Sequence, residues 1–189
     1  MNQVKEEKEF PYISSVGVGI PDKVIANEEL EQIVDTSDEW ITSRTGIKNR
    51  HVLKEEEDPS SLGVTASKEA ISGAPVDKTD IDLVVTATNI SDMPIPGSSP
   101  FITRELGLTD DIPFFDLKAG CSGFLYAIDV AINMIRGDGY DDVLIVGLEA
   151  LSRVVDWRDR STCVLFGDAA GAAVVSSGGT TGKVLSSSI

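Results

Sequence analysis

Cys121 is the residue of this chain best placed for covalent chemistry. It lies in Ala119-Gly-Cys-Ser-Gly-Phe124, between an apolar stretch, Pro113–Leu117, that predicts a short buried strand and helix-forming residues from Ser122 onward. Unpaired N–H groups and the positive end of the helix dipole favour a thiolate there, and the thiolate is the nucleophilic form of cysteine. The flanking glycines suit a tight turn that a substrate can approach. The alternative is a small buried thiol without reactivity.

The helix that follows Cys121 is apolar around its whole circumference. Its apolar residues are Phe124, Leu125, Ala127, Ile128, Val130, Ala131, Ile132, Met134 and Ile135. A helix that is apolar on both faces belongs inside a larger core. We therefore expect this helix to be covered on both sides, which requires more protein than one sheet with two helical layers.

Apolar, β-branched stretches alternate with helical patterns along the chain. Strands are predicted at Tyr12–Ile20, Asp82–Thr88, Asp142–Leu148, the second half of Phe166–Val175, and the start of one more in Lys183–Ile189. Helices are predicted at Glu28–Val34 with Asn27 as N-cap, between the cap Ser37 and Gly46, at Ser60–Ser72 and at Ser98–Leu106. Exposed connections are expected at Asn49–His51 and Val154–Thr162. The alternation predicts an α/β fold with a largely parallel sheet.

The composition is that of an ordinary soluble globular domain. The chain has 189 residues, of which 41% are hydrophobic and 25% charged, which suits one domain with a sizeable core. A formal net charge of -15 argues against a nucleic-acid partner, which needs clustered Lys and Arg, and weakly against an anionic membrane. Two cysteines, a polar stretch Met1–Phe10 without a signal segment, and no membrane-length apolar run predict a cytoplasmic protein.

Three motifs carry a resemblance to a known family. They are Val34–Ile47 (Val-Asp-Thr-Ser-Asp-Glu-Trp-Ile-Thr-Ser-Arg-Thr-Gly-Ile), Ala119–Phe124 and Val164–Ala173. In this order and spacing they closely resemble 3-oxoacyl-[acyl-carrier-protein] synthase III, the condensing enzyme that starts type II fatty acid synthesis. The resemblance covers residues 12–189, after a flexible tail at 1–11, and only the N-terminal half of the family protein. It implies a thiolase-like fold, with this chain as one half of a five-layer αβαβα arrangement and a mixed, mostly parallel sheet.

The resemblance also implies a mechanism. Cys121 matches the nucleophile that takes an acyl group from acyl-CoA as a thioester. Malonyl-acyl carrier protein then decarboxylates, and its carbanion attacks that thioester. The backbone N–H of Cys121 would contribute to an oxyanion hole. The implied partners are acyl-CoA, as substrate rather than cofactor, and malonyl-acyl carrier protein, with no metal and no bound cofactor.

Further site residues follow from the same resemblance. Trp40 and Arg160 match the pair that sandwiches the adenine of CoA, and stacking suits a flat base. Polar contacts at the CoA mouth match Thr36 and Arg44. The acyl and pantetheine channel matches Leu151 and Phe166. In the expected homodimer, held by the strand near Pro113, Ile95 stands where the family often has Phe and would reach the neighbouring subunit's acyl pocket.

The main departure from the family concerns its catalytic His and Asn, which lie in the other half of the family protein. The only histidine here is His51, which we expect to be a surface or supporting residue because a base must lie within hydrogen-bond reach of its nucleophile. We therefore expect this chain to be inactive in condensation by itself. Since carrier proteins are acidic, Arg44, Lys48 and Arg50 are expected to supply part of a basic docking patch.

Several alternatives remain open from the sequence. Trp40 could be an ordinary core residue, and the whole chain a non-catalytic thiolase-like scaffold that binds acyl-CoA. A related hydroxymethylglutaryl-CoA synthase or polyketide starter ketosynthase would use the same cysteine with other partners. Cys163, at the start of an apolar strand, is expected to be a core cysteine. Asp168 is expected to be structural, with its carboxylate binding backbone N–H groups at a bend.

Overall fold

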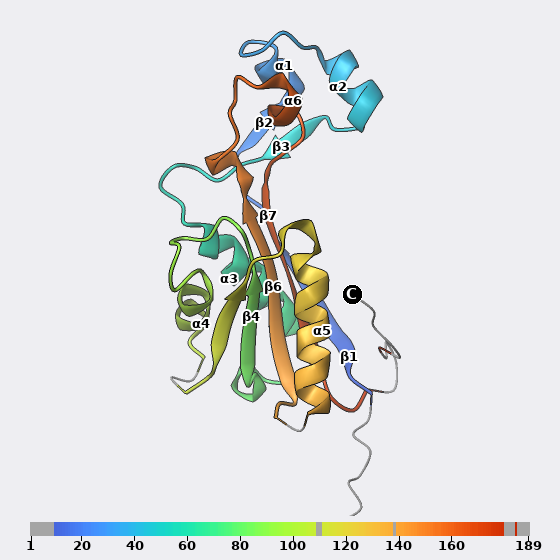
Figure 1. Cartoon of the computed structure of the whole chain (residues 1–189), viewed down its shortest axis with the longest axis vertical. Helices are drawn as coiled ribbons and strands as arrows, with labels where there is room; N and C mark the ends of the chain where they lie inside the picture. The colour runs from blue at the N-terminus through green and yellow to red at the C-terminus, as the bar shows by residue number, and fades with distance from the viewer. Residues whose placement is uncertain (1–9, 109–110, 138, 180–183, 185–189) are drawn as a thin grey trace, which may run out of the picture.

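The computed structural model describes residues 10–108, 111–137, 139–179 and 184. Its centre is a five-stranded sheet in the order β1-β7-β6-β4-β5. These strands are β1 (Tyr12–Gly19), β7 (Asp168–Ser176), β6 (Asp142–Ala150), β4 (Leu83–Ala87) and β5 (Phe114–Leu117). Helices α3 (Pro59–Gly73) and α4 (Ser99–Leu106) cover one face, and α5 (Gly123–Arg136) lies on the other (Figure 1).

The directions of the strands agree with the predicted mixed sheet. β4 runs parallel to both β5 and β6, whereas β7 is antiparallel to both β6 and β1. Four of the five strands therefore point the same way, and β7 alone is reversed. The β5 strand lies at the edge of the sheet with Phe114 42% exposed, so the expectation that it is buried is wrong for the described chain.

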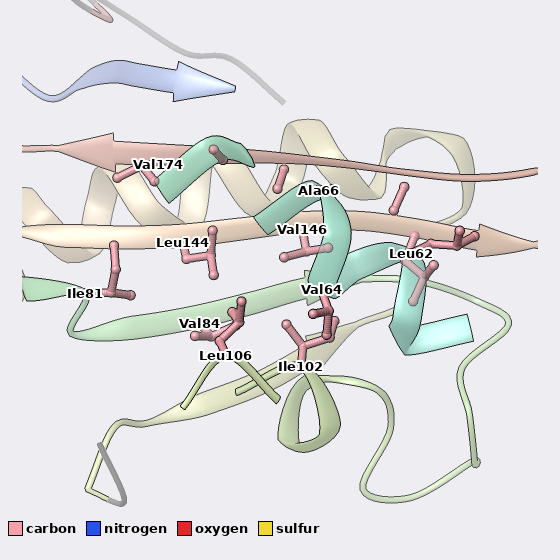
Figure 2. Close-up of a cluster of buried hydrophobic side chains, with 14 of the residues drawn as sticks. Leu62, Val64, Ala66, Ile81, Val84, Ile102, Leu106, Leu144, Val146 and Val174 are labelled. Atoms are coloured by element: carbon pink, nitrogen blue, oxygen red, sulfur yellow. The ribbon is translucent and has the colours of Figure 1, made fainter. Parts of the chain in front are cut away.

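Alternate strand residues fill the core beneath α3 and α4. Val84, Leu144 and Val174 of the strands lie in one buried cluster with Leu62 and Ile102 of the two helices (Figure 2). Fully burying a side chain of this kind stabilises a fold by about 1.5–3 kcal/mol. This cluster contains more buried residues than the one on the other face of the sheet, and it packs against the face of β4 and β6 opposite α5.

The opposite face of the sheet packs against α5. Val85 and Ile145 of the strands contact a buried stripe on the helix that includes Ala131 and Ile135. The outward side of α5 is covered only in part by described residues: Leu125 is 60% exposed, whereas Val184 packs against the cluster and its carbonyl accepts a hydrogen bond from Arg136 at 3.3 Å. The described residues pack chiefly against one side of this helix, so coverage of its other side, which was expected from protein beyond this sheet and its helices, stays a prediction.

The starts of α3 and α4 are held by acidic side chains from distant segments. Asp92 accepts hydrogen bonds from the Ser60 N–H at 3.1 Å and the Ser60 hydroxyl at 2.7 Å. Asp116 accepts from the N–H groups of Ser98 at 2.7 Å and Ser99 at 2.9 Å. Both carboxylates satisfy helix N–H groups that would otherwise have no partner. They also fix the two ends of the loop 92–98.

A smaller unit lies beyond one end of the sheet (Figure 1). It contains the antiparallel pair of strands β2 (Val24–Ala26) and β3 (Asn49–His51), with the helices α1 (Asn27–Leu30), α2 (Asp38–Thr45) and α6 (Arg160–Cys163). Three short 3-10 turns complete the chain, η1 (Lys78–Asp80), η2 (Gly120–Ser122) and η3 (Leu151–Arg153).

Three predicted elements of this unit are corrected. Asn49–His51 is a strand rather than an exposed connection, and the first helix ends at Leu30 rather than Val34. Asn27 is the first residue of that helix instead of its cap, because its buried side chain donates to Asp38 at 2.8 Å and to the Ile47 carbonyl at 2.8 Å. The region 154–162 is not wholly a loop either, since α6 begins within it.

Arg50 is a further correction, because it is buried and cannot contribute to a basic docking patch. Its guanidinium donates to the Ile25 carbonyl at 3.0 Å and to Asn27 Oδ1 at 2.7 Å. Burial lowers the pKa of this guanidinium. Arg44 and Lys48 remain exposed.

Two sequence expectations concern residues that the structure does not describe. Residues 1–9 of the predicted tail lie outside the described residues, as does most of the strand expected at Lys183–Ile189. Within the described chain, none of the helices combines the length and the apolar character needed to cross a lipid bilayer.

Candidate active site

Cys121 lies in the turn η2 that joins β5 to α5. The preceding residue, Gly120, has a φ of 60°, in the left-handed region that glycine adopts without strain. This conformation turns the chain from the end of the strand into the helix, so that Cys121 stands two residues before Gly123, the first residue of α5. The thiol is exposed, whereas that of Cys163 is buried. The predicted position of Cys121 at a helix N-terminus is confirmed.

Cys121 lines an apolar cavity of about 510 Å³. Three small residues on neighbouring strands line this cavity side by side, because Ala87 pairs with Gly147 and Gly147 pairs with Gly171. The ring of Phe124 lies over Gly147, and a Cβ at that glycine would come within 2.9 Å of the ring. The absence of a side chain at Gly147 therefore leaves room for the Phe124 ring, which lines the cavity together with Cys121.

Leu151 and Phe166 form part of the wall of the same cavity. The sequence resemblance assigned both residues to an acyl and pantetheine channel, and the structure brings them together with Cys121. The segment between them contains α6, whose Arg160 stacks on Trp40. One segment thus connects the cysteine cavity to the smaller unit of the molecule, and the start of α5 faces that unit (Figure 1).

Trp40, on α2, is flanked by two guanidinium groups. The guanidinium carbon of Arg160 lies 4.0 Å from the ring centroid and that of Arg44 lies 4.6 Å from it. A second cavity of about 300 Å³ is lined by Trp40 and Arg160 together with Thr36. Thr36 Oγ1 and Arg160 Nε are both shielded from solvent and have no hydrogen-bond partner among the described residues. The structure therefore gathers all four residues predicted for the CoA mouth.

Local carboxylates fix the two helices that carry this cluster. The hydroxyl and N–H of Ser161, followed by the Thr162 hydroxyl, lower the pKa of Asp159, which caps α6. On α2, the amide of Asn27 and then the hydroxyl of Thr42 lower the pKa of Asp38. Ionised carboxylates at helix N-termini are favourable, so the starts of both helices that carry Trp40 and Arg160 are stabilised by charge.

Ile95 does not join either cavity. It stands in the loop between β4 and α4 and is 86% exposed. Its predicted role in a neighbouring subunit's pocket remains a prediction.

His51 and Asp168 lie away from the thiol cavity. A ring nitrogen of His51 is 2.6 Å from the Pro21 carbonyl, and His51 does not line the Cys121 cavity. The Asp168 carboxylate accepts from the N–H groups of Leu53 at 2.7 Å and Ser152 at 2.8 Å. The structural role predicted for Asp168 is confirmed. Cys163 is a core residue as expected, although it ends α6 instead of beginning a strand.

Sequence reasoning missed two polar residues of the cysteine cavity, Asn89 and Glu149. They follow β4 and lie near the end of β6, respectively, and bind each other across the sheet. The sequence signal that could have found them is the two-residue alternation of side chains along a strand, which puts Asn89 on the same face as Ala87, and Glu149 on the same face as Gly147.

The sequence profile of the 3-oxoacyl-[acyl-carrier-protein] synthase III family matches residues 115–189, which include Cys121. Beta-ketoacyl-[acyl-carrier-protein] synthase III of Neisseria meningitidis serogroup B is 44% identical over 176 residues, which are 93% of this chain and 55% of the relative. Over the matched residues the chain is similar to members of the 3-oxoacyl-[acyl-carrier-protein] synthase III family. The chain spans about half the length of the curated relatives that it matches, as also for the family member of Ehrlichia canis, at 45% identity and 51% of the relative.

Solved structures agree with this similarity. The 3-oxoacyl-[acyl-carrier-protein] synthase III of Aquifex aeolicus matches with a TM-score of 0.83 and 44% identity over 88% of this chain and 53% of its own. The priming beta-ketosynthase of the R1128 polyketide pathway matches with a TM-score of 0.86 and 37% identity over 94% and 53%. The thiolase-like fold expected from the family's motifs is confirmed.

Proposed function

We propose that this chain is the nucleophile-bearing part of an enzyme that condenses an acyl group from acyl-CoA with malonyl-acyl carrier protein. One observation supports this most directly: Cys121 is exposed, stands at the start of α5 and lines an apolar cavity of about 510 Å³. An apolar cavity suits an acyl chain, and a helix start suits a thiolate. Similarity to the 3-oxoacyl-[acyl-carrier-protein] synthase III family supports the reaction class.

The proposed reaction has two steps at one sulfur. The Cys121 thiolate attacks the thioester carbonyl of acyl-CoA, a bond forms between that carbon and Sγ, and the CoA thiolate leaves and takes up a proton. Malonyl-acyl carrier protein then loses CO₂, its carbanion attacks the acyl carbon, and the Cys121 thiolate leaves. Backbone N–H groups at the start of α5, including that of Cys121, would stabilise the oxyanion in both steps.

Recognition of CoA is proposed for the cluster around Trp40. An indole face and a guanidinium plane together suit a flat, electron-rich base. The unpaired Thr36 Oγ1 and Arg160 Nε offer polar groups for the nucleotide, since buried polar atoms without partners favour a ligand that completes them. Leu151 and Phe166 lie on the segment that leads from this cluster to Cys121.

The chain is proposed to be inactive in condensation by itself. No described residue around the Cys121 cavity is a histidine, and the single histidine of the sequence binds the Pro21 carbonyl. A general base acts only within hydrogen-bond reach of its proton. The groups that assist decarboxylation and proton transfer would therefore come from outside this chain.

Incubation with acetyl-CoA followed by intact-mass measurement tests the proposal. We expect the chain to gain the mass of one acetyl group and the Cys121→Ser variant to gain none, with no condensed product when malonyl-acyl carrier protein is added. A chain that stays unacetylated would favour the alternative of a non-catalytic acyl-CoA-binding scaffold. A polyketide-priming role, suggested by the likeness to the R1128 ketosynthase, would share the acetylation step and differ in the acceptor.

Ile95 is proposed to widen the range of primers in the complete homodimer. It is smaller than the Phe often found at this position in the family, and its exposed loop position suits contact with a second subunit. In the complete enzyme, Ile95→Phe should lower the rate with isobutyryl-CoA more than the rate with acetyl-CoA. Equal rates for the variant and the parent with both primers would contradict this role.

A further inference from the structure

A series of hydrogen bonds along the lining of the cysteine cavity connects Glu149 of β6, through Asn89, to the turn that holds Cys121. Glu149 Oε1 accepts from the backbone N–H of Asn89 at 2.9 Å and from its side-chain Nδ2 at 2.5 Å. Asn89 Oδ1 in turn accepts from the N–H of Gly120 at 3.3 Å. All three residues line the same cavity as the thiol.

The start of α5 has no cap of its own. Neither Ala119 nor Ser122 makes a side-chain capping bond to the turn or the helix, and the Ser122 hydroxyl donates to the Ala119 carbonyl instead. The first N–H groups of a helix need acceptors, and side chains usually provide them locally. Here the acceptor for the residue before Cys121 comes from Asn89, which follows a different strand.

Glu149 determines which end of the Asn89 amide faces that turn. An asparagine amide has one accepting oxygen and one donating nitrogen. Because the nitrogen is directed to the Glu149 carboxylate, the oxygen is directed to Gly120. Oε2 of Glu149 is shielded from solvent and has no hydrogen-bond partner among the described residues, so the bonds found for this carboxylate all go through Oε1 to Asn89.

We propose that Asn89 and Glu149 are positioning residues for Cys121, which hold the Gly120 turn so that the thiol stays aligned with the start of α5. The inference rests on the proposed role of Cys121 as nucleophile. Gly120 has a left-handed backbone with open space around its α-carbon, so packing does not restrain it. The hydrogen bond from the Gly120 N–H to Asn89 Oδ1, called the tether below, restrains the turn instead.

The test is the rate at which iodoacetamide alkylates Cys121 in the full chain. Glu149→Met keeps a side chain of similar length without an acceptor, and Glu149→Gln keeps an acceptor oxygen. We expect Glu149→Met and Asn89→Ala to slow alkylation about fivefold, the change for one lost hydrogen bond of ordinary strength. Glu149→Gln should react like the parent chain, because it still accepts from Asn89.

A double variant and two controls separate the tether from general damage. Asn89→Ala combined with Glu149→Met should be no slower than either single variant, because both break one chain of bonds. Glu105→Met, an exposed site on α4, should leave the rate unchanged, and buried Cys163 should stay unlabelled in every variant that is folded. Asn89 lies on an exposed turn, so its variant tests the tether independently of any effect of Glu149→Met on β6.

Three results would overturn the inference: parental or faster alkylation in Asn89→Ala, equal slowing in Glu149→Gln and Glu149→Met, or additive losses in the double variant. Failure of the proposed function would look different. In that case the parent chain would not be acetylated by acetyl-CoA, while the alkylation ratios would still report on the tether.

Discussion

The guanidinium carbon of Arg160 lies 4.0 Å from the centroid of the Trp40 ring, which is stacking contact between two groups from distant parts of the chain. Flat groups in contact are separated by about 3.5–4.0 Å. A base held between them needs roughly twice that spacing. The cluster is therefore closed, and an adenine can enter the stack only if Arg160 moves away from the indole.

Binding of CoA should thus change the surroundings of Trp40. In a Trp157→Phe background, where Trp40 is the remaining tryptophan, CoA should alter the tryptophan fluorescence in a saturable way. Trp40→Ala and Arg160→Ala should each weaken binding about tenfold, since stacking on one base contributes about 1–3 kcal/mol. Calorimetric titration with CoA measures the affinity of both variants. Equal affinity of Trp40→Ala and the parent would contradict the proposed adenine site.

The close contact between β1 and α3 depends on Gly17, which has no side chain. A Cβ at Gly17 would overlap the Ala66 carbonyl oxygen and come within 2.6 Å of the Ala70 backbone nitrogen. Backbone cannot move aside as a flexible side chain can, so Gly17→Ala should lower the free energy of unfolding by about 1–3 kcal/mol. Urea denaturation measures this loss.

Gly73→Ala is the matched control for that substitution. Its Cβ would lie 3.5 Å from the Ser15 Cβ, an ordinary contact, at the exposed last residue of α3. Its stability should equal or slightly exceed that of the parent, because alanine favours a helix more than glycine does. A Gly17→Ala chain as stable as the Gly73→Ala chain would show that β1 and α3 are not packed as described.

Two partly buried carboxyl groups, just before β4 and at the start of β6, make stability depend on pH. Burial raises the pKa of Asp82 and of Asp142, and Oδ1 of each has no hydrogen-bond partner among the described residues. A carboxyl whose pKa is raised in the folded state stabilises that state fully below the unfolded pKa of 3.8, and this contribution is lost as the pH rises through the folded pKa. Ionised Asp82 should therefore weaken the fold at neutral pH.

Asp82→Asn should raise the melting temperature at pH 7, and the gain should shrink as the pH falls below about 4. The amide keeps an oxygen for the Asp141 N–H, which Asp82 now accepts at 2.7 Å. Asp22→Asn, at an exposed site, should change little at either pH. A melting temperature for Asp82→Asn that is lowered at pH 7 would contradict the assigned direction of the shift.

Local sequence signals predicted the elements that depend on local physics. The continuous apolar run of β4 is buried at every position, and the helices that end at Gly46 and Gly107 do so in the left-handed conformation expected of a terminal glycine. The motif around Cys121 predicted the helix N-terminus for the same reason. These features need no knowledge of the rest of the fold.

The polar residues that sequence reasoning missed depend on contacts between distant segments. Arg50 looks like a surface cation until β2, β3 and Val164 enclose it, and Asn27 looks like a helix cap until its amide is used by Asp38 and Ile47. Asn89 and Glu149 stand 60 residues apart, and nothing local pairs them. Polar networks of this kind follow from the topology of the sheet, which the sequence specified only as a class.

The central claim, that Cys121 accepts an acyl group from CoA, is tested most directly by protection from alkylation. The chain would be incubated with acetyl-CoA and then with iodoacetamide, and the label at Cys121 and Cys163 would be quantified by peptide mass spectrometry after unfolding in a second, distinguishable alkylating reagent. The account predicts that acetyl-CoA blocks the first label at Cys121, and that hydroxylamine, which cleaves thioesters, restores it. Equal first labelling of Cys121 with and without acetyl-CoA, unaffected by hydroxylamine, would contradict it.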